Sequence, residues 1–83
     1  MNSTEIETVL REELRRIAPD IDIDDINQNG ELREEMDIDS MDFLNLVTAL
    51  GKRLNLAMPE ADYARMVTFS DMLNYLQSRP QSQ

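Results

Sequence analysis

Hydrophobic residues recur at helical spacing in three stretches of the chain, and each stretch predicts an amphipathic helix. The predicted helices cover residues 4–17, 40–54 and 69–79, and a shorter helical segment, residues 60–66, follows Pro59. No stretch alternates between apolar and polar residues as a half-buried strand would. Residues 1–83 are therefore expected to form a single all-α domain, a small four-helix bundle with three main helices and one short third helix. Its first loop is long.

Polar residues at the ends of these stretches predict where the helices begin. Thr4 and Glu7 have the spacing of a capping box, so Thr4 is the expected N-cap of the first helix. Asp39 is the expected N-cap of the second helix, with Asp42 at its third position. Thr68 is the expected N-cap of the last helix.

The start of the second predicted helix holds a serine in a defined position. If Asp39 is the N-cap, Ser40 is the first helical residue and its hydroxyl is exposed. Ile38 and Phe43 stand at the two positions of a hydrophobic staple, which would fix the direction of the entering chain. Met41 falls on the polar side of the helix, where it either contacts a partner or is simply an exposed apolar residue.

The composition excludes several classes of function. The 83 residues include no cysteine and no histidine, so a disulfide, a cysteine-based zinc site and a Ser-His-Asp triad are all excluded. No apolar run is long enough to span a membrane, and the first residues do not resemble a signal peptide. We therefore expect a cytoplasmic protein without membrane insertion.

Acidic residues are concentrated in the middle of the chain. The formal net charge is −9, and the stretch from Asp20 to Asp42 has ten acidic residues and one basic residue, Arg33. Such a surface disfavours nucleic acid and favours basic partners, although it also serves solubility alone. Helical periodicity is lost between Asp20 and Met36, where scattered isoleucines predict a loop that packs over the bundle.

Part of this loop matches a calcium-binding pattern. The run Asp25-Ile26-Asn27-Gln28-Asn29-Gly30 has the first half of an EF-hand loop, in which oxygen ligands alternate before a glycine. The twelfth position should be a bidentate glutamate but is Met36, and Arg33 occupies the ninth. An EF-hand-like calcium-binding module is therefore an alternative function, but no tight metal site is expected.

Four segments of the chain resemble acyl carrier proteins. The attachment motif of that family is Asp-Ser-Leu, usually followed by Asp, and this chain has Asp39-Ser40-Met41-Asp42. The segment Leu32-Arg33-Glu34-Glu35-Met36 is similar to the one that precedes the family motif. Downstream, Met58-Pro59-Glu60 and Thr68-Phe69-Ser70-Asp71 lie where the family's third and fourth helices begin. The resemblance covers nearly the whole chain.

The resemblance has departures. Asp37 stands where the family usually has glycine, and Met41 replaces the leucine after the serine. Asn45 replaces a usual acid, and Lys52 and Arg53 end the second helix where the family is usually acidic. These changes favour a specialised carrier that serves one pathway over the housekeeping carrier of fatty acid synthesis.

The resemblance implies a function and a set of site residues. Ser40 would accept 4′-phosphopantetheine from coenzyme A through a separate phosphopantetheinyl transferase, and the chain itself would not be an enzyme. The thiol of the arm would hold acyl groups as thioesters for fatty acid, polyketide or specialised lipid synthesis. The implied partners are acyl-transferring, condensing or acyl-activating enzymes, and the carrier would be a monomer.

The expected docking residues are Asp39, Met41 and Asp42. The expected lining of an acyl cavity is Leu46, Leu50, Met58 and Met66. A non-carrier helical adaptor, with Ser40 as an ordinary helix residue, stays open as another alternative.

Overall fold

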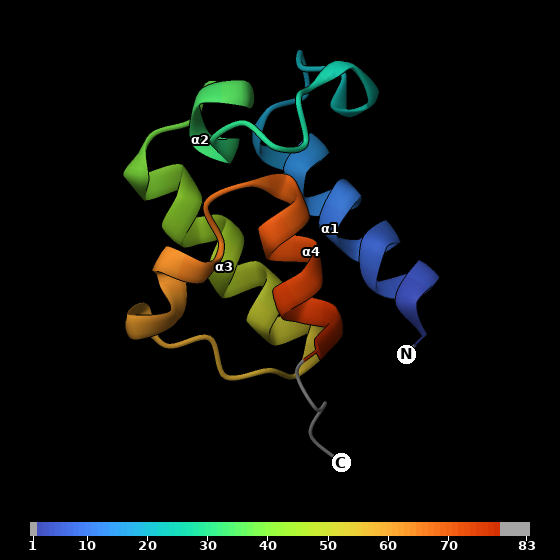
Figure 1. Ribbon diagram of the computed structural model, residues 1–83, viewed down its shortest axis with the longest axis vertical. Helices are drawn as coiled ribbons and strands as arrows, with labels where there is room; N and C mark the ends of the chain where they lie inside the picture. The colour runs from blue at the N-terminus through green and yellow to red at the C-terminus, as the bar shows by residue number, and fades with distance from the viewer. Residues whose placement is uncertain (1, 79–83) are drawn as a thin grey trace.

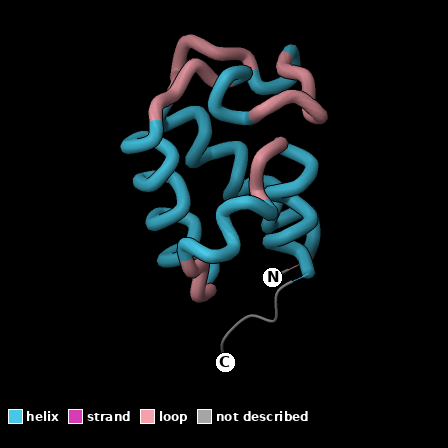
Figure 2. Tube along the Cα trace, turned by 60° about the vertical axis from the view of Figure 1, so that its left-hand side comes forward, coloured by secondary structure: helices cyan, strands magenta, loops and turns pink. Residues whose placement is uncertain are grey.

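Three helices form a bundle in the computed structural model, which describes residues 2–78 (Figures 1 and 2). The main helices are α1 (Ser3–Ile17), α3 (Ser40–Leu54) and α4 (Phe69–Ser78). The shorter ones are η1 (Ile23–Asp25), α2 (Leu32–Glu35) and η2 (Glu60–Arg65), where η marks a 3-10 helix. Within the described part of the chain there is no strand, and the prediction of an all-α bundle is confirmed. The short third helix is η2.

One hydrophobic core lies between the three main helices. Helix α1 contacts both α3 and α4, and the apolar faces predicted from the periodicity point inward. The side chains with no exposed surface include Leu10, Leu14, Leu50, Met72 and Leu76. Because these residues come from all three helices, burial of this shared core is the main force that assembles the bundle.

The predicted helix starts are confirmed at two helices and wrong at the first. Asp39 is the N-cap of α3, and the Thr68 hydroxyl oxygen caps α4 by accepting the Asp71 backbone N–H at 2.9 Å. Helix α1 begins earlier than predicted, because the Asn2 side chain accepts the Glu5 N–H at 2.8 Å. Thr4 is therefore inside the helix and does not cap it. The last helix was predicted to reach residue 79, which lies outside the described residues.

The long first loop contains two helical turns that the hydrophobic pattern does not predict. Helix α2 spans a single turn, and η1 is shorter still. Leu32 and Met36 stand four residues apart and are almost completely buried, while Ile23 is buried beside α1. The prediction that the loop packs over the bundle is confirmed.

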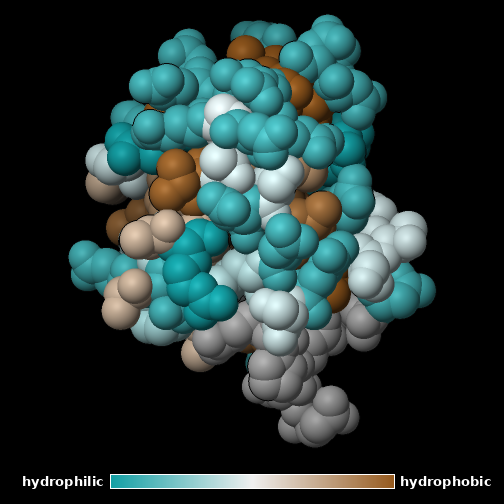
Figure 3. Space-filling view, viewed as in Figure 1, coloured by the Kyte–Doolittle hydropathy of each residue, from teal (hydrophilic) through white to brown (hydrophobic). Residues whose placement is uncertain are grey.

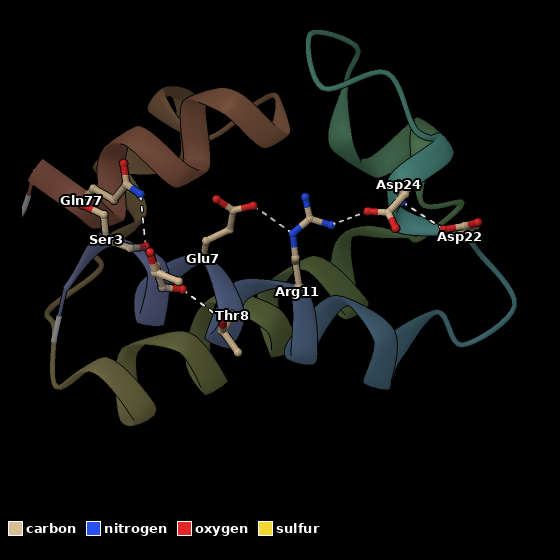
Figure 4. A network of polar contacts seen from close by, with 8 residues as sticks. Ser3, Glu7, Thr8, Arg11, Asp22, Asp24 and Gln77 are labelled. Carbon is tan, nitrogen blue, oxygen red and sulfur yellow. Dashed lines mark hydrogen bonds and ion pairs between the residues drawn. The ribbon is translucent and has the colours of Figure 1, made fainter.

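Polar contacts attach this loop to both α1 and the start of α4. Arg11 of α1 donates to Glu7 at 2.9 Å and to Asp24 of η1 at 2.8 Å (Figure 4). Hydrogen bonding to Glu7 is the largest cause of the raised pKa of Arg11. At the other end of the loop, the Leu32 backbone N–H donates to the Val67 carbonyl oxygen at 2.7 Å. The segment before α2 is thus joined to the segment before α4.

A buried carboxylate links α1 to the end of α3. Glu13 is 2% exposed and accepts a hydrogen bond from Arg53 at 2.9 Å. Arg53 also donates to Glu12 at 2.7 Å, and Arg16 lies 3.7 Å from Glu13. Hydrogen bonding to Glu12 and Glu13 raises the pKa of Arg53 above its ordinary value. Removing Arg53 would leave the buried Glu13 carboxylate with Arg16, 3.7 Å away, as its partner.

The turn between α2 and α3 has a backbone conformation that favours glycine. Asp37 has a φ of 53°, in the left-handed region. Its N–H donates to the Glu34 carbonyl oxygen at 3.2 Å, and the Ile38 N–H donates to the Arg33 carbonyl oxygen at 2.9 Å. This accounts for the glycine usual at this position in the resembled family, because a left-handed residue with a Cβ costs about 1–2 kcal/mol.

We predict that Arg53→Met destabilises the fold by about 2 kcal/mol, because Glu13 loses its closest cation inside the protein. Urea unfolding followed by circular dichroism measures this change. The control Lys52→Met removes an exposed neighbouring cation and should change stability by less than about 0.5 kcal/mol. Adding Glu13→Met to Arg53→Met should recover much of the loss. Equal stability of Arg53→Met and the parent would contradict a stabilising role for this pair.

We predict that Asp37→Gly raises the free energy of unfolding by about 0.5–1 kcal/mol, because glycine adopts the positive φ without strain. The β-branched variant Asp37→Val should lower it. The matched control Glu34→Gln removes an acidic charge from the same turn region, so it separates charge relief from backbone relief. A gain in Glu34→Gln as large as that in Asp37→Gly would show that charge, not backbone conformation, is responsible.

Candidate functional site

The first turn of α3 presents Ser40 on a fixed backbone. Asp39 Oδ1 accepts the Asp42 N–H at 2.9 Å, and the Asp39 carbonyl oxygen accepts the Phe43 N–H at 3.0 Å. The reciprocal bond of a full capping box, from the Asp39 N–H to Asp42, is absent from the hydrogen bonds of residues 2–78. Ile38 is buried before the cap, as expected for a staple residue, and Ser40 is exposed. The serine hydroxyl therefore faces solvent from a backbone that is held on both sides.

A pocket of about 540 Å³ lies next to Ser40. Apolar side chains form most of it, and the charged residues Glu31, Arg33 and Glu60 also contribute to its lining. Its apolar members are Met41, Phe43, Leu44, Tyr63, Ala64, Met66 and Val67. Figure 3 shows apolar side chains exposed on the left of the molecule, in the region of α3 and η2 in Figure 1. The arrangement suits a small apolar group attached near Ser40.

Three segments distant in the sequence build this pocket. Glu31 and Arg33 come from the α2 region, Ser40 to Leu44 from the start of α3, and the remaining residues from η2 and the connection to α4. The hydrogen bond from Leu32 to Val67 holds the first and third segments together. Met66 is fully buried and anchors the third segment in the core.

The expected docking residues lie at the cap and in the first turn of α3, and one of them, Met41, lines this pocket. Asp39 is exposed, Met41 is 65% exposed, and Asp42 is half-buried. Leu44 and Val67, which line the same pocket, are also unusually exposed for large apolar residues, at 43% and 44%. Exposed apolar side chains that gather in one place favour a contact surface over chance exposure.

The expected cavity residues do not all reach one pocket. Met66 lines the pocket beside Ser40, but Leu46 and Leu50 are packed in the core with at most 1% exposure. Met58 is half-buried and lines a second pocket of about 420 Å³ further along α3. The lining of an acyl cavity by these four residues stays a prediction. In this structure Met66 and Met58 line two different pockets, and Leu46 and Leu50 line neither.

Basic residues near the end of α3 have different surroundings. Arg53 is bound to Glu12 and Glu13 of α1, so it does not simply add positive charge to the outer face of α3. Lys52 is exposed. Arg33 is the basic residue that lines the pocket beside Ser40.

In the loop that resembles an EF-hand, side-chain oxygen atoms accept hydrogen bonds from nearby backbone N–H groups. Asn27 Oδ1 accepts the Asn29 N–H at 3.0 Å, and Glu35 accepts the Asn27 N–H at 2.8 Å. In residues 2–78, no three or more acidic side chains are grouped so that they could hold a metal ion. The same residues contain no helix that is long and apolar enough to cross a membrane.

Several residues that line this pocket were not identified as site residues from the sequence, among them Phe43, Leu44, Tyr63 and Val67. Phe43 and Leu44 follow Ser40 by three and four residues, which places them beside it on a helix, so this spacing could have identified them. Tyr63 and Val67 reach the pocket only through the fold, and no local pattern marks them.

Comparisons with known proteins identify the family of this chain. Residues 4–76 match the family model described as phosphopantetheine attachment site. The chain is 28% identical to an acyl carrier protein of Campylobacter fetus over 72 residues, which are 87% of each chain. It is 27% identical to an acyl carrier protein of Chlamydia caviae over 59 residues, covering 71% of this chain and 77% of that protein.

The fold is similar to a solution structure of a candidate acyl carrier protein from Anaplasma phagocytophilum. The TM-score is 0.79, with 22% identity, and the match covers 99% of this chain and 97% of the other. That similarity supports the fold, and the family model covers nearly the whole bundle together with the exposed serine at the start of α3. The chain belongs to the phosphopantetheine-binding family of acyl carrier proteins.

Proposed function

We propose that Ser40 is the residue to which 4′-phosphopantetheine, the prosthetic group of this family, is attached. The supporting observation is the position of its exposed hydroxyl, on the first residue of α3 and at the edge of an apolar pocket. A phosphate at this point would lie at a helix N-terminus, where backbone N–H groups favour an anion. The pocket offers apolar surface to a group held on the arm.

The other described serines fit this role less well. Ser3 also begins a helix but does not line the apolar pocket, and Ser70 is half-buried at the start of α4. The Ser78 hydroxyl donates to the Tyr75 carbonyl oxygen at 3.1 Å. Among the serines of residues 2–78, Ser40 alone combines exposure, a helix start and the apolar pocket.

Attachment requires an enzyme supplied from outside. The Ser40 oxygen forms a bond to the phosphorus that carries the pantetheine in coenzyme A. The P–O bond from that phosphorus to the adenosine bisphosphate breaks, and the adenosine bisphosphate leaves. The phosphopantetheinyl transferase takes the hydroxyl proton. The chain has no histidine, and Oδ1 of the Asp39 carboxylate, on the residue before Ser40, accepts the Asp42 N–H. The protein is thus the substrate of this reaction and not its catalyst.

The loaded protein would present acyl thioesters to successive enzymes, because tethering keeps a group at high local concentration near each active site. Its partners would be acyl-transferring, condensing or acyl-activating enzymes of fatty acid, polyketide or specialised lipid synthesis. A dedicated pathway is favoured because Asn45 and Lys52, both exposed on α3, leave this helix less acidic than the family usually is. The proposed form is a monomeric single domain in the cytoplasm.

The site assignment predicts a defined gain in mass. Incubation with coenzyme A and a broad-specificity transferase should add one phosphopantetheine to the protein, and intact-mass spectrometry detects it. Ser40→Ala should abolish the addition, while Ser3→Ala, at the other exposed helix start, should not change it. A mass gain that persists in Ser40→Ala would show that another residue is modified.

If Asp42 is part of a docking surface, its charge should affect the rate of Ser40 modification in a salt-dependent way. Asp42→Lys should slow modification of Ser40 at low salt, and the difference from the parent should shrink as salt screens the attraction to the transferase. The matched control is Asp71→Lys, because Asp71 occupies the same third position in α4 and is exposed away from Ser40. Initial rates measured over a range of salt concentrations test this. If the two variants lose rate equally, the effect is a general cost of a lysine near a helix start, not a docking effect.

A further inference from the structure

The side chain of Tyr63 separates two pockets that lie along α3. The pocket beside Ser40 includes Tyr63 in its lining, and so does the second pocket, which contains Met58 and Leu56. No other residue lines both pockets. We refer to Tyr63, the residue that lines both pockets, as the partition.

Phe43 holds this partition from the side of α3. The Phe43 and Tyr63 rings meet edge to face, with centroids 5.8 Å apart and an interplanar angle of 78°. This geometry is favourable for aromatic pairs. Phe43 follows Ser40 by three residues on the same helix, so the ring pair stands close to the expected origin of the arm.

The opposite side of the partition is held by α4. The Tyr75 hydroxyl donates to Asp62 Oδ2 at 2.6 Å, which fixes the residue next to Tyr63. Helix η2 itself has no fully buried residue and no side-chain cap at its start. Arg65 of η2 also lies over the Tyr75 ring, 5.1 Å from its centroid, so η2 is attached to α4 by two contacts on either side of Tyr63.

The core behind the first pocket is filled by buried side chains. Leu46, Leu50 and Met66 are each at most 1% exposed, and α1 covers the far side of α3. A group that outgrows the pocket beside Ser40 must either displace Tyr63 or stay in solvent. The position of Met58 beyond Tyr63 marks where a longer chain would arrive.

We propose that Tyr63, held against Phe43, determines the length of acyl chain that the protein shelters. Short acyl groups occupy the pocket beside Ser40, and the aromatic pair stops longer chains from extending along α3 to Met58. The substrate class that fits is therefore acyl thioesters whose chains end before Tyr63. This inference rests on the proposed attachment of the arm at Ser40.

Methionine methyl groups provide reporters on the two sides of the partition. Met66 lines the first pocket and Met58 the second. The protein is labelled with ¹³C-methyl methionine, loaded by a transferase from butanoyl, octanoyl or dodecanoyl coenzyme A, and compared with the unloaded arm. In the parent, every acyl group should shift the Met66 resonance, and the Met58 resonance should stay in place even with dodecanoyl.

Substitutions at Tyr63 should open the path. In Tyr63→Leu and Tyr63→Ala, the dodecanoyl group should also shift Met58, with the population at Met58 raised about two- to tenfold by loss of the ring pair. The matched control Tyr63→Phe keeps the ring that meets Phe43 edge to face, so it should behave as the parent. If Tyr63→Ala does not fold by circular dichroism, Tyr63→Leu and the chain-length series in the parent still decide the question.

The outcomes separate this inference from the proposed function. If the arm cannot be attached at Ser40, the mass spectrum shows it before any acyl chain is examined, and the proposed function fails. If the arm attaches and dodecanoyl shifts Met58 in the parent as strongly as in Tyr63→Leu, Tyr63 is not a partition. A Met58 resonance that stays in place in both Tyr63→Leu and Tyr63→Ala would also overturn the inference.

Discussion

The hydrogen bond from the Leu32 N–H to the Val67 carbonyl oxygen, 2.7 Å long, is the constraint on which the site depends. It joins the loop before α2 to the connection before α4, and the neighbouring bridge between Glu31 and Thr68 extends this join. The two joined segments face the start of α3, and the space among the three is the pocket beside Ser40. Without this join, the pocket beside Ser40 would lose a contact that holds two of its three lining segments together.

The backbone around Ser40 is stabilised by local interactions that differ in strength. The Asp39 cap and the buried Ile38 favour one position of the first turn of α3. Asp37, two residues earlier, adopts a left-handed conformation at some cost because it has a Cβ. The site is thus a well-held helix start after a mildly strained turn. The cost must be offset by burial of Met36 and Ile38 on its two sides.

The sequence predicted the features of this protein that depend on local periodicity and capping. The three main helices, the caps by Asp39 and Thr68 and the exposure of Met41 follow from patterns of a few residues. Thr4 was a misleading cap, because its spacing to Glu7 is also found inside a helix and Asn2 is the competing cap. Helix α2 was not predicted, because a single turn is too short to show helical periodicity in the hydrophobic residues.

Long-range contacts account for what the sequence did not predict. Tyr63 meets Phe43 from a segment twenty residues away, and nothing in either neighbourhood indicates the pair. Arg53 was expected to alter the outer face of α3, yet its contacts with Glu12 and Glu13 make it part of the α1–α3 interface. Such pairings depend on how helices cross, which single-sequence patterns do not encode.

The central claim is that Ser40 and the pocket beside it act as one site. Isotope-filtered nuclear Overhauser spectra of the protein loaded with a ¹³C-labelled butanoyl group test this most directly, because they report which side chains lie against the acyl carbons. The account predicts cross-peaks from the acyl group to the Phe43 ring and the Met66 methyl group, which line the pocket from two different segments. An acyl group that shows cross-peaks to neither residue, on a protein that is fully loaded at Ser40, would contradict it.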